Sequence, residues 1–67
     1  MKSVSGKEMA RILERRGWVA TRSRGSHRRY EKTGYPSITI PIHGNKSLKL
    51  GLQHRIMKDA GLTEADL

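Results

Sequence analysis

Residues 37–42, with the sequence Ser-Ile-Thr-Ile-Pro-Ile, place an isoleucine at every second position. Because successive side chains of a strand point to opposite faces, this pattern predicts a strand that buries its isoleucines on one covered face. Pro41 has no backbone N–H to donate, so the strand is expected to lie at a sheet edge or to end at that residue. The chain is therefore expected to fold around an antiparallel sheet that packs on one side.

Two further segments in the centre of the chain have the composition of strands. Residues 18–22 are rich in aromatic and β-branched side chains, and residues 27–32 follow them after a turn at Gly25 and Ser26. A second turn at residues 33–36 leads into the isoleucine strand. Since short turns join antiparallel neighbours, the three segments predict a three-stranded antiparallel sheet.

Helical signals flank the three strands. Ser5 and Glu8 fit a capping box and Gly17 supplies a stop, which predicts a first helix over residues 6–16. The second helix is indicated by apolar residues at spacings of four, closed by Gly61: Leu48, Leu52, Ile56 and Ala60. A last turn is expected over residues 63–66. The predicted fold class is α+β in the order α-β-β-β-α, a single domain over residues 1–67 with both helices covering one face of the sheet.

Positive charge narrows the possible partners. The 67 residues include 14 Lys and Arg against 6 Asp and Glu, a net charge of +8. Between residues 15 and 58 the only acid is Glu31, and the basic residues are Arg15, Arg16, Arg22, Arg24, Arg28, Arg29, Lys32, Lys46, Lys49, Arg55 and Lys58. Such a field attracts polyanions. The chain has no cysteine and no apolar run of about 18 residues, so a cytoplasmic protein without membrane contact is expected.

A histidine lies within this basic region, in the run Gly25-Ser26-His27-Arg28-Arg29-Tyr30. If Tyr30 packs inward with the isoleucines, strand alternation turns His27, Arg29 and Glu31 to the open face of the sheet, unless a bulge intervenes. Candidate phosphate contacts are Arg24, Arg28, Arg29 and Lys46, with Arg29 closest to His27 by alternation.

Histidine can take a proton near neutral pH, and the guanidinium groups around His27 disfavour the charged imidazolium. RNA carries its own nucleophile in the 2′-hydroxyl, so its cleavage needs a base for that proton and positive charge for the developing phosphorane. His27 and its arginines offer both. The alternative is an exposed strand histidine without a role.

The chain has two other histidines. His43 follows the third strand and is a candidate second acid or base, or a phosphate contact, although it could simply hydrogen-bond within its loop. His54 is expected to be an exposed helical residue. The three histidines match no common zinc spacing and no carboxylates accompany them, so no metal site and no cofactor are expected.

The few aromatic residues could stack on RNA bases or fill the core. Because the chain has only one tryptophan and two tyrosines and few other large apolar residues, Trp18 and Tyr30 are assigned to the core. Tyr35, in the turn before Pro36, is expected to be exposed.

Five segments together carry a family resemblance: Ser5-Gly6-Lys7-Glu8, Gly17-Trp18, Gly25-Ser26-His27-x-x-Tyr30, Pro41-Ile42-His43 and Ile56-x-x-x-Ala60-Gly61-Leu62-Thr63. In these segments the chain resembles the HicA/YcfA-like toxins over essentially its whole length. One departure is Leu52 after Gly51, where many relatives have threonine or serine.

This resemblance implies a fold like that of the double-stranded-RNA-binding domain and a metal-independent endoribonuclease that cleaves messenger RNA, with His27 at the position of the catalytic histidine. It also implies the toxin role in a type II toxin–antitoxin system. The implied partner is a HicB-type antitoxin that covers the active face, and the pair commonly represses its own operon, so operator DNA is expected to be bound only through the complex. A basic toxin face predicts an acidic antitoxin surface over it.

A second function class keeps the fold without the catalysis. In it, the chain is a basic module that binds RNA through phosphates and 2′-hydroxyls and does not cut it. A DNA-binding helix-turn-helix is disfavoured by the strand-rich centre.

Overall fold

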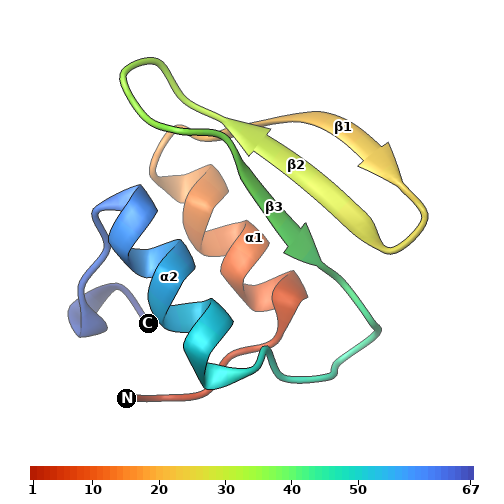
Figure 1. Ribbon diagram of the computed structural model, residues 1–67. Coiled ribbons are helices and arrows are strands. Elements are labelled where there is room, and N and C mark those ends of the chain that lie inside the picture. Colours follow the sequence, from red (N-terminus) through yellow and green to blue (C-terminus); the bar gives the residue numbers. More distant parts are fainter.

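The computed structural model describes residues 1–67, and its elements follow the order helix, three strands, helix. They are α1 (Gly6–Arg15), β1 (Val19–Arg24), β2 (His27–Glu31), β3 (Ile38–Pro41), α2 (Leu50–Ala60) and a final 3-10 turn, η1 (Glu64–Asp66). The strands form one antiparallel sheet in the order β1-β2-β3. Both helices lie on the same side of it (Figure 1). The predicted α+β fold class is confirmed.

The first helix begins and ends where its local signals predict, to within one residue. The Ser5 hydroxyl accepts a hydrogen bond from the Glu8 backbone N–H at 3.1 Å, and the Glu8 carboxylate accepts one from the Ser5 N–H at 3.0 Å. Val4 and Met9, on either side of this capping box, are both buried in the core. Past the other end, Gly17 has φ +90°, a conformation that glycine adopts without steric cost.

The core lies between the sheet and the two helices, as the isoleucine alternation predicts. Tyr30, Ile38 and Ile40 of β2 and β3 point into it and are at most 4% exposed. Pro41 is the last residue of β3, which is an edge strand, so both expectations for this proline are confirmed. Trp18 is buried and Tyr35 is exposed, also as predicted. The Tyr35 ring packs on the Trp18 ring with 5.4 Å between centroids.

The second helix begins later than the apolar spacing indicates. Leu48 precedes it, because the Leu48 N–H donates to the Val4 carbonyl at 2.9 Å and thereby holds residue 48 against the N-terminal segment. Leu52 is only partly buried. The side chains that α2 buries are Gln53, Ile56, Met57 and Ala60. Gln53 is polar but satisfied, since its amide accepts from the Val4 N–H at 3.0 Å and donates to the Lys2 carbonyl at 2.6 Å.

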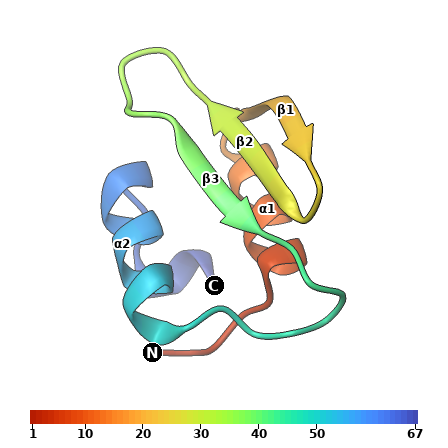
Figure 2. The ribbon, with the colours of Figure 1, turned by 45° about the vertical axis from the view of Figure 1, so that its right-hand side comes forward.

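The helices cover less of the sheet than expected. All six residues of β1 are exposed, so neither face of this strand is packed against a helix. Figures 1 and 2 show the β1–β2 hairpin extending past α1, whereas β3 lies close to both helices. The other side of the sheet carries no covering element. The hairpin therefore presents a large surface to a ligand or partner.

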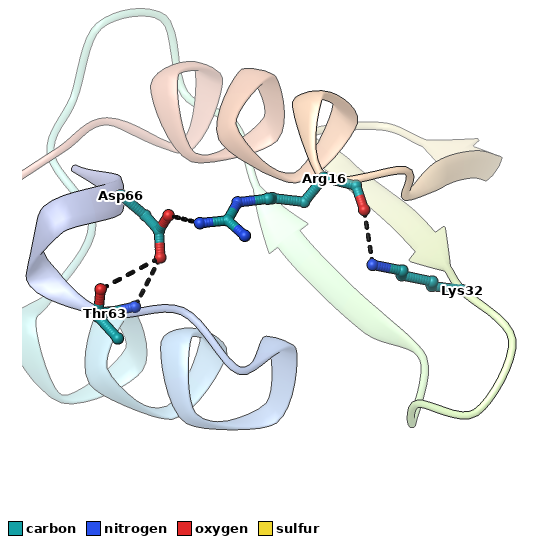
Figure 3. A network of polar contacts seen from close by, with 4 residues as sticks. All are labelled: Arg16, Lys32, Thr63 and Asp66. Atoms are coloured by element: carbon teal, nitrogen blue, oxygen red, sulfur yellow. Dashed lines mark hydrogen bonds and ion pairs between the residues drawn. The ribbon is translucent and has the colours of Figure 1, made fainter.

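A polar network fastens the C-terminal turn to the rest of the fold (Figure 3). The Arg16 guanidinium pairs with the Asp66 carboxylate, which also accepts from the Thr63 N–H at 2.8 Å. The Lys32 ammonium donates to the Arg16 carbonyl at 2.6 Å. The network thus joins the end of α1 to η1 and to the segment after β2. None of the helices has the length and apolar character needed to cross a membrane.

Candidate active site

A bulge in β1 decides which side chains share the open face of the hairpin. Arg24 pairs with His27 and Arg22 with Arg29, but the register shifts between Ala20 and Arg22. The extra residue is the one between them, at position 21. Since directly paired residues of an antiparallel sheet share a face, the bulge turns both β1 arginines to the side of His27. An unbroken alternation from Ala20 would turn them to the helix side.

The open face holds a shallow basic hollow of about 190 Å³, here called the His27 pocket. Its lining residues are Arg22, Arg24, His27, Arg29 and Thr39, none of them hydrophobic. All five side chains belong to exposed residues. Three guanidinium groups, one imidazole and one hydroxyl therefore converge on a site that a phosphate group can enter from solvent.

Arg29 is the most firmly placed of these arginines. Its Nη2 donates to the Ser37 hydroxyl at 3.1 Å, and its Nε lies 3.9 Å from a Glu31 carboxylate oxygen. Both members of this ion pair are about half exposed, so solvent screens it and it contributes little stability. Arg22 and Arg24 have no ion-pair partner in the protein. Their charge is available to a bound anion.

Arg28 lies on the opposite face of β2 from His27, because it follows His27 directly in the strand. Its Nη1 lies 3.4 Å from the Tyr30 hydroxyl, which donates in turn to the Glu14 carboxylate. Burial raises the pKa of the Tyr30 hydroxyl, and the hydrogen bond to Tyr30 raises the pKa of Arg28. Arg28 therefore stays charged on the helix side of the sheet.

The remaining predicted residues line other hollows. His43 and Lys46 line one of about 320 Å³ beside Pro41 and Lys49, in the loop between β3 and α2. His54 is exposed on α2, as predicted, and lines a hollow of about 620 Å³. Of the predicted site residues, the His27 pocket thus unites Arg24, His27 and Arg29. Arg28, His43 and Lys46 are not among its lining residues.

Two residues of the His27 pocket were missed by sequence reasoning. Thr39 pairs with Arg29 across β2 and β3, and the alternation of the isoleucine strand already places it opposite the core. Arg22 reaches the pocket only because of the bulge, for which the sequence carries no glycine or other clear signal. Nowhere in the protein do three or more His, Cys, Asp or Glu side chains gather in an arrangement that could hold a metal ion.

The fold and this pocket define a class of small, basic α+β proteins whose open sheet face carries arginines around one histidine. The model of one protein family, described as the HicA toxin of bacterial toxin–antitoxin systems, matches residues 6–62. The chain therefore belongs to the HicA toxin family and is the toxin of a toxin–antitoxin pair, with an antitoxin as its partner. No curated protein matches the chain.

Proposed function

We propose that this toxin is a metal-independent endoribonuclease that cleaves messenger RNA, with His27 as its general base. The proposal is supported above all by one observation: His27 shares an exposed, purely polar hollow with Arg22, Arg24 and Arg29. These residue types supply a proton acceptor and a phosphate-binding surface in one place. The site needs no metal for this reaction, because RNA brings its own nucleophile.

In the proposed reaction, the unprotonated imidazole of His27 accepts the proton of a ribose 2′-hydroxyl. The 2′-oxygen forms a bond to the adjacent phosphorus, and the bond from phosphorus to the 5′-oxygen breaks. The leaving 5′-oxygen takes a proton from water at this open face, and the hydroxide that remains takes the proton of the His27 imidazolium, which restores the free base. The products are a 2′,3′-cyclic phosphate and a 5′-hydroxyl end.

The arginines of the pocket have separate roles in this scheme. Arg29, held by Ser37, is oriented before the substrate arrives and therefore loses little freedom on binding. Arg22 and Arg24 stabilise the extra negative charge that the phosphorane carries relative to the bound RNA. Thr39 can donate its hydroxyl hydrogen to a phosphate oxygen in the same hollow.

Neutralisation of this activity follows from the same surface. We propose that a HicB-type antitoxin lays an acidic surface over the open face and so excludes RNA from His27. Such a complex would weaken with rising salt, because its charges lie at an exposed interface. Operator DNA would be bound through this complex, and messenger RNA as substrate implies action in the cytoplasm.

The decisive experiment is cleavage of a mixed single-stranded and structured RNA by purified protein in EDTA. The native chain is compared with His27→Ala and with His54→Ala, which removes an exposed histidine far along the chain in α2. General base catalysis contributes about 10²–10⁴-fold, so His27→Ala should lose at least about 100-fold in rate while His54→Ala keeps it. Cleavage by the native chain should leave 2′,3′-cyclic phosphate ends.

Other results would replace the proposal. If all three proteins bind RNA and none cuts it, the chain is an RNA-binding module. If His27→Ala cuts as fast as the native chain, the base lies elsewhere, and His43 is the next candidate. A His43→Gln variant tests that assignment, and Lys46→Gln tests the adjoining predicted phosphate contact.

A further inference from the structure

A second basic groove lies on the other side of the hairpin, where the helices are. It has a volume of about 510 Å³ and lies between α1 and the loop that follows β3. We call it the α1 groove; its polar lining residues are Lys7, Arg11, Glu14, Arg28 and Asn45. Three cations and one carboxylate leave an excess of positive charge. None of these residues lines the His27 pocket.

Two of the cations come from successive turns of α1. Lys7 and Arg11 are four residues apart, so their side chains point the same way and are offset by about 6 Å along the helix axis. Both are exposed and neither has an ion-pair partner. They therefore form a short row of positive charge that is free to bind successive anionic groups.

The third cation, Arg28, is held in place by a buried side chain. Tyr30 is fully buried, and its hydroxyl bridges the Arg28 guanidinium and the Glu14 carboxylate. A guanidinium has five N–H donors, and the contact with Tyr30 uses one. Arg28 is thus anchored at one end of its fork with donors left for a ligand. This gives the α1 groove a preorganised phosphate contact.

The two basic sites meet at one end of the sheet. His27 and Arg28 are neighbours in β2 and point to opposite faces. Beside them, the Ile42 N–H donates to the Ser26 carbonyl at 2.6 Å, so the loop after β3 starts against the hairpin turn. A long, flexible ligand bound at His27 has only to pass around this end of the sheet to reach the α1 groove.

The lining of the groove favours nucleic acid over protein. Its only apolar members are Ala10, which is buried, and Ile42, which is half-buried. Protein interfaces have an apolar core, whereas nucleic-acid interfaces are more polar and far more positively charged. We infer that the α1 groove binds the phosphates of single-stranded RNA that flank the nucleotides held at His27. The inference rests on RNA being the ligand, as proposed above.

Binding in a cleavage-deficient His27→Ala background tests this without relying on catalysis. The probes are fluorescein-labelled uridine oligomers of 4 and 12 nucleotides, measured by anisotropy. Lys7→Gln/Arg11→Gln should leave the affinity for the 4-mer unchanged and weaken that for the 12-mer. Each lost phosphate contact lowers the salt slope by about 0.7 for single strands. Between 50 and 200 mM KCl, the parent should therefore lose about sevenfold more affinity for the 12-mer than the double variant does.

The matched control is Arg15→Gln/Lys58→Gln, which removes the same charge from residues that line neither basic site. This control should keep the parent's salt slope and length dependence. Equal losses in both double variants, or no loss in either, would overturn the inference. Normal RNA binding by Lys7→Gln/Arg11→Gln with lost binding to the antitoxin would also overturn it, because the groove would then be a protein-docking surface.

Failure of the groove and failure of the proposed function give different results. If the native chain does not cut RNA but binds the 12-mer through Lys7 and Arg11, the endoribonuclease proposal is refuted and the inferred RNA binding by the α1 groove is supported. If the native chain cuts RNA and the Lys7→Gln/Arg11→Gln variant binds the 12-mer as its parent does, the inferred RNA binding by the α1 groove is refuted and the proposed function is supported.

Discussion

Gly6 is the residue at which helix propensity and packing predict opposite effects on stability. It is the first residue of α1, and it lies against the end of β3. A Cβ atom added there would come within 2.1 Å of the Pro41 carbonyl oxygen and 3.3 Å of the Ile42 Cα. Both are backbone atoms, so no side-chain rotation can relieve the contact. To reach 3.0 Å, the closest approach that Cβ atoms make, the carbonyl would have to retreat by about 0.9 Å.

The free energy of unfolding of Gly6→Ala can be worked from these contacts. Alanine is the better helix former by at most about 1 kcal/mol, which alone predicts stabilisation. Overpacking costs about 1–3 kcal/mol, and a rigid backbone neighbour puts this site at the upper end. We expect a net loss of about 2 kcal/mol, or roughly 8–16 °C in Tm for a domain of this size.

Gly51→Ala is the matched control, because Gly51 is also helical and nothing lies within 4 Å of its added Cβ. It should gain up to about 1 kcal/mol. Urea unfolding followed by circular dichroism measures both variants. A loss of stability in Gly6→Ala together with a gain in Gly51→Ala would support the packing argument. A Gly6→Ala protein as stable as the native chain would refute it, since the close approach of α1 to β3 would then be absent in solution.

Three further predictions concern stability and pH. Ser5→Ala removes the helix cap and should cost about 0.5–2 kcal/mol in urea unfolding; an unchanged midpoint would mean that the capping box is not formed. The hydrogen bond from the Ser5 backbone lowers the pKa of Glu8, so the ionised Glu8 carboxylate stabilises the fold above the ordinary pKa of 4.5, and this stabilisation is lost as pH falls through the lowered pKa. Glu8→Gln should therefore make the Tm less sensitive to acid. Equal acid sensitivity of the variant and the native chain would contradict this. Burial raises the pKa of Tyr30, so the neutral Tyr30 hydroxyl stabilises the fold below pH 10.0, and this stabilisation is lost as pH rises through the raised pKa. Tyr30→Phe should therefore reduce the fall in Tm at alkaline pH. An unchanged fall would mean that other groups cause it.

Much of the fold could be predicted because its signals are local. The capping box involves residues three apart, and the helix stops depend on single glycines. The alternation of residues 37–42 identifies the buried face, and Tyr30 joins it as one of few large side chains available to a core. Because side chains alternate along a strand, the burial of Tyr30 on that face alone places His27 and Arg29 on the open side of the sheet. This much of the candidate site was predictable.

The rest depends on contacts between distant parts of the chain. Leu48 reads as helical by spacing, yet pairing with the N-terminal segment holds it outside α2. The exposure of β1 depends on where α1 crosses the sheet, and no pattern within β1 determines that position.

The sequence by itself determined the elements, their order and the histidine on the open face, because hydrogen bonds and side-chain alternation within a few residues specify them. Only the tertiary structure decided which arginines of β1 join His27. A bulge forms where two strands compensate a mismatch in pairing, so the placement of Arg22 and Arg24 depends on β2 as well as on β1. The position of Arg28 over Tyr30 and Glu14 likewise exists only once α1 packs beneath the sheet.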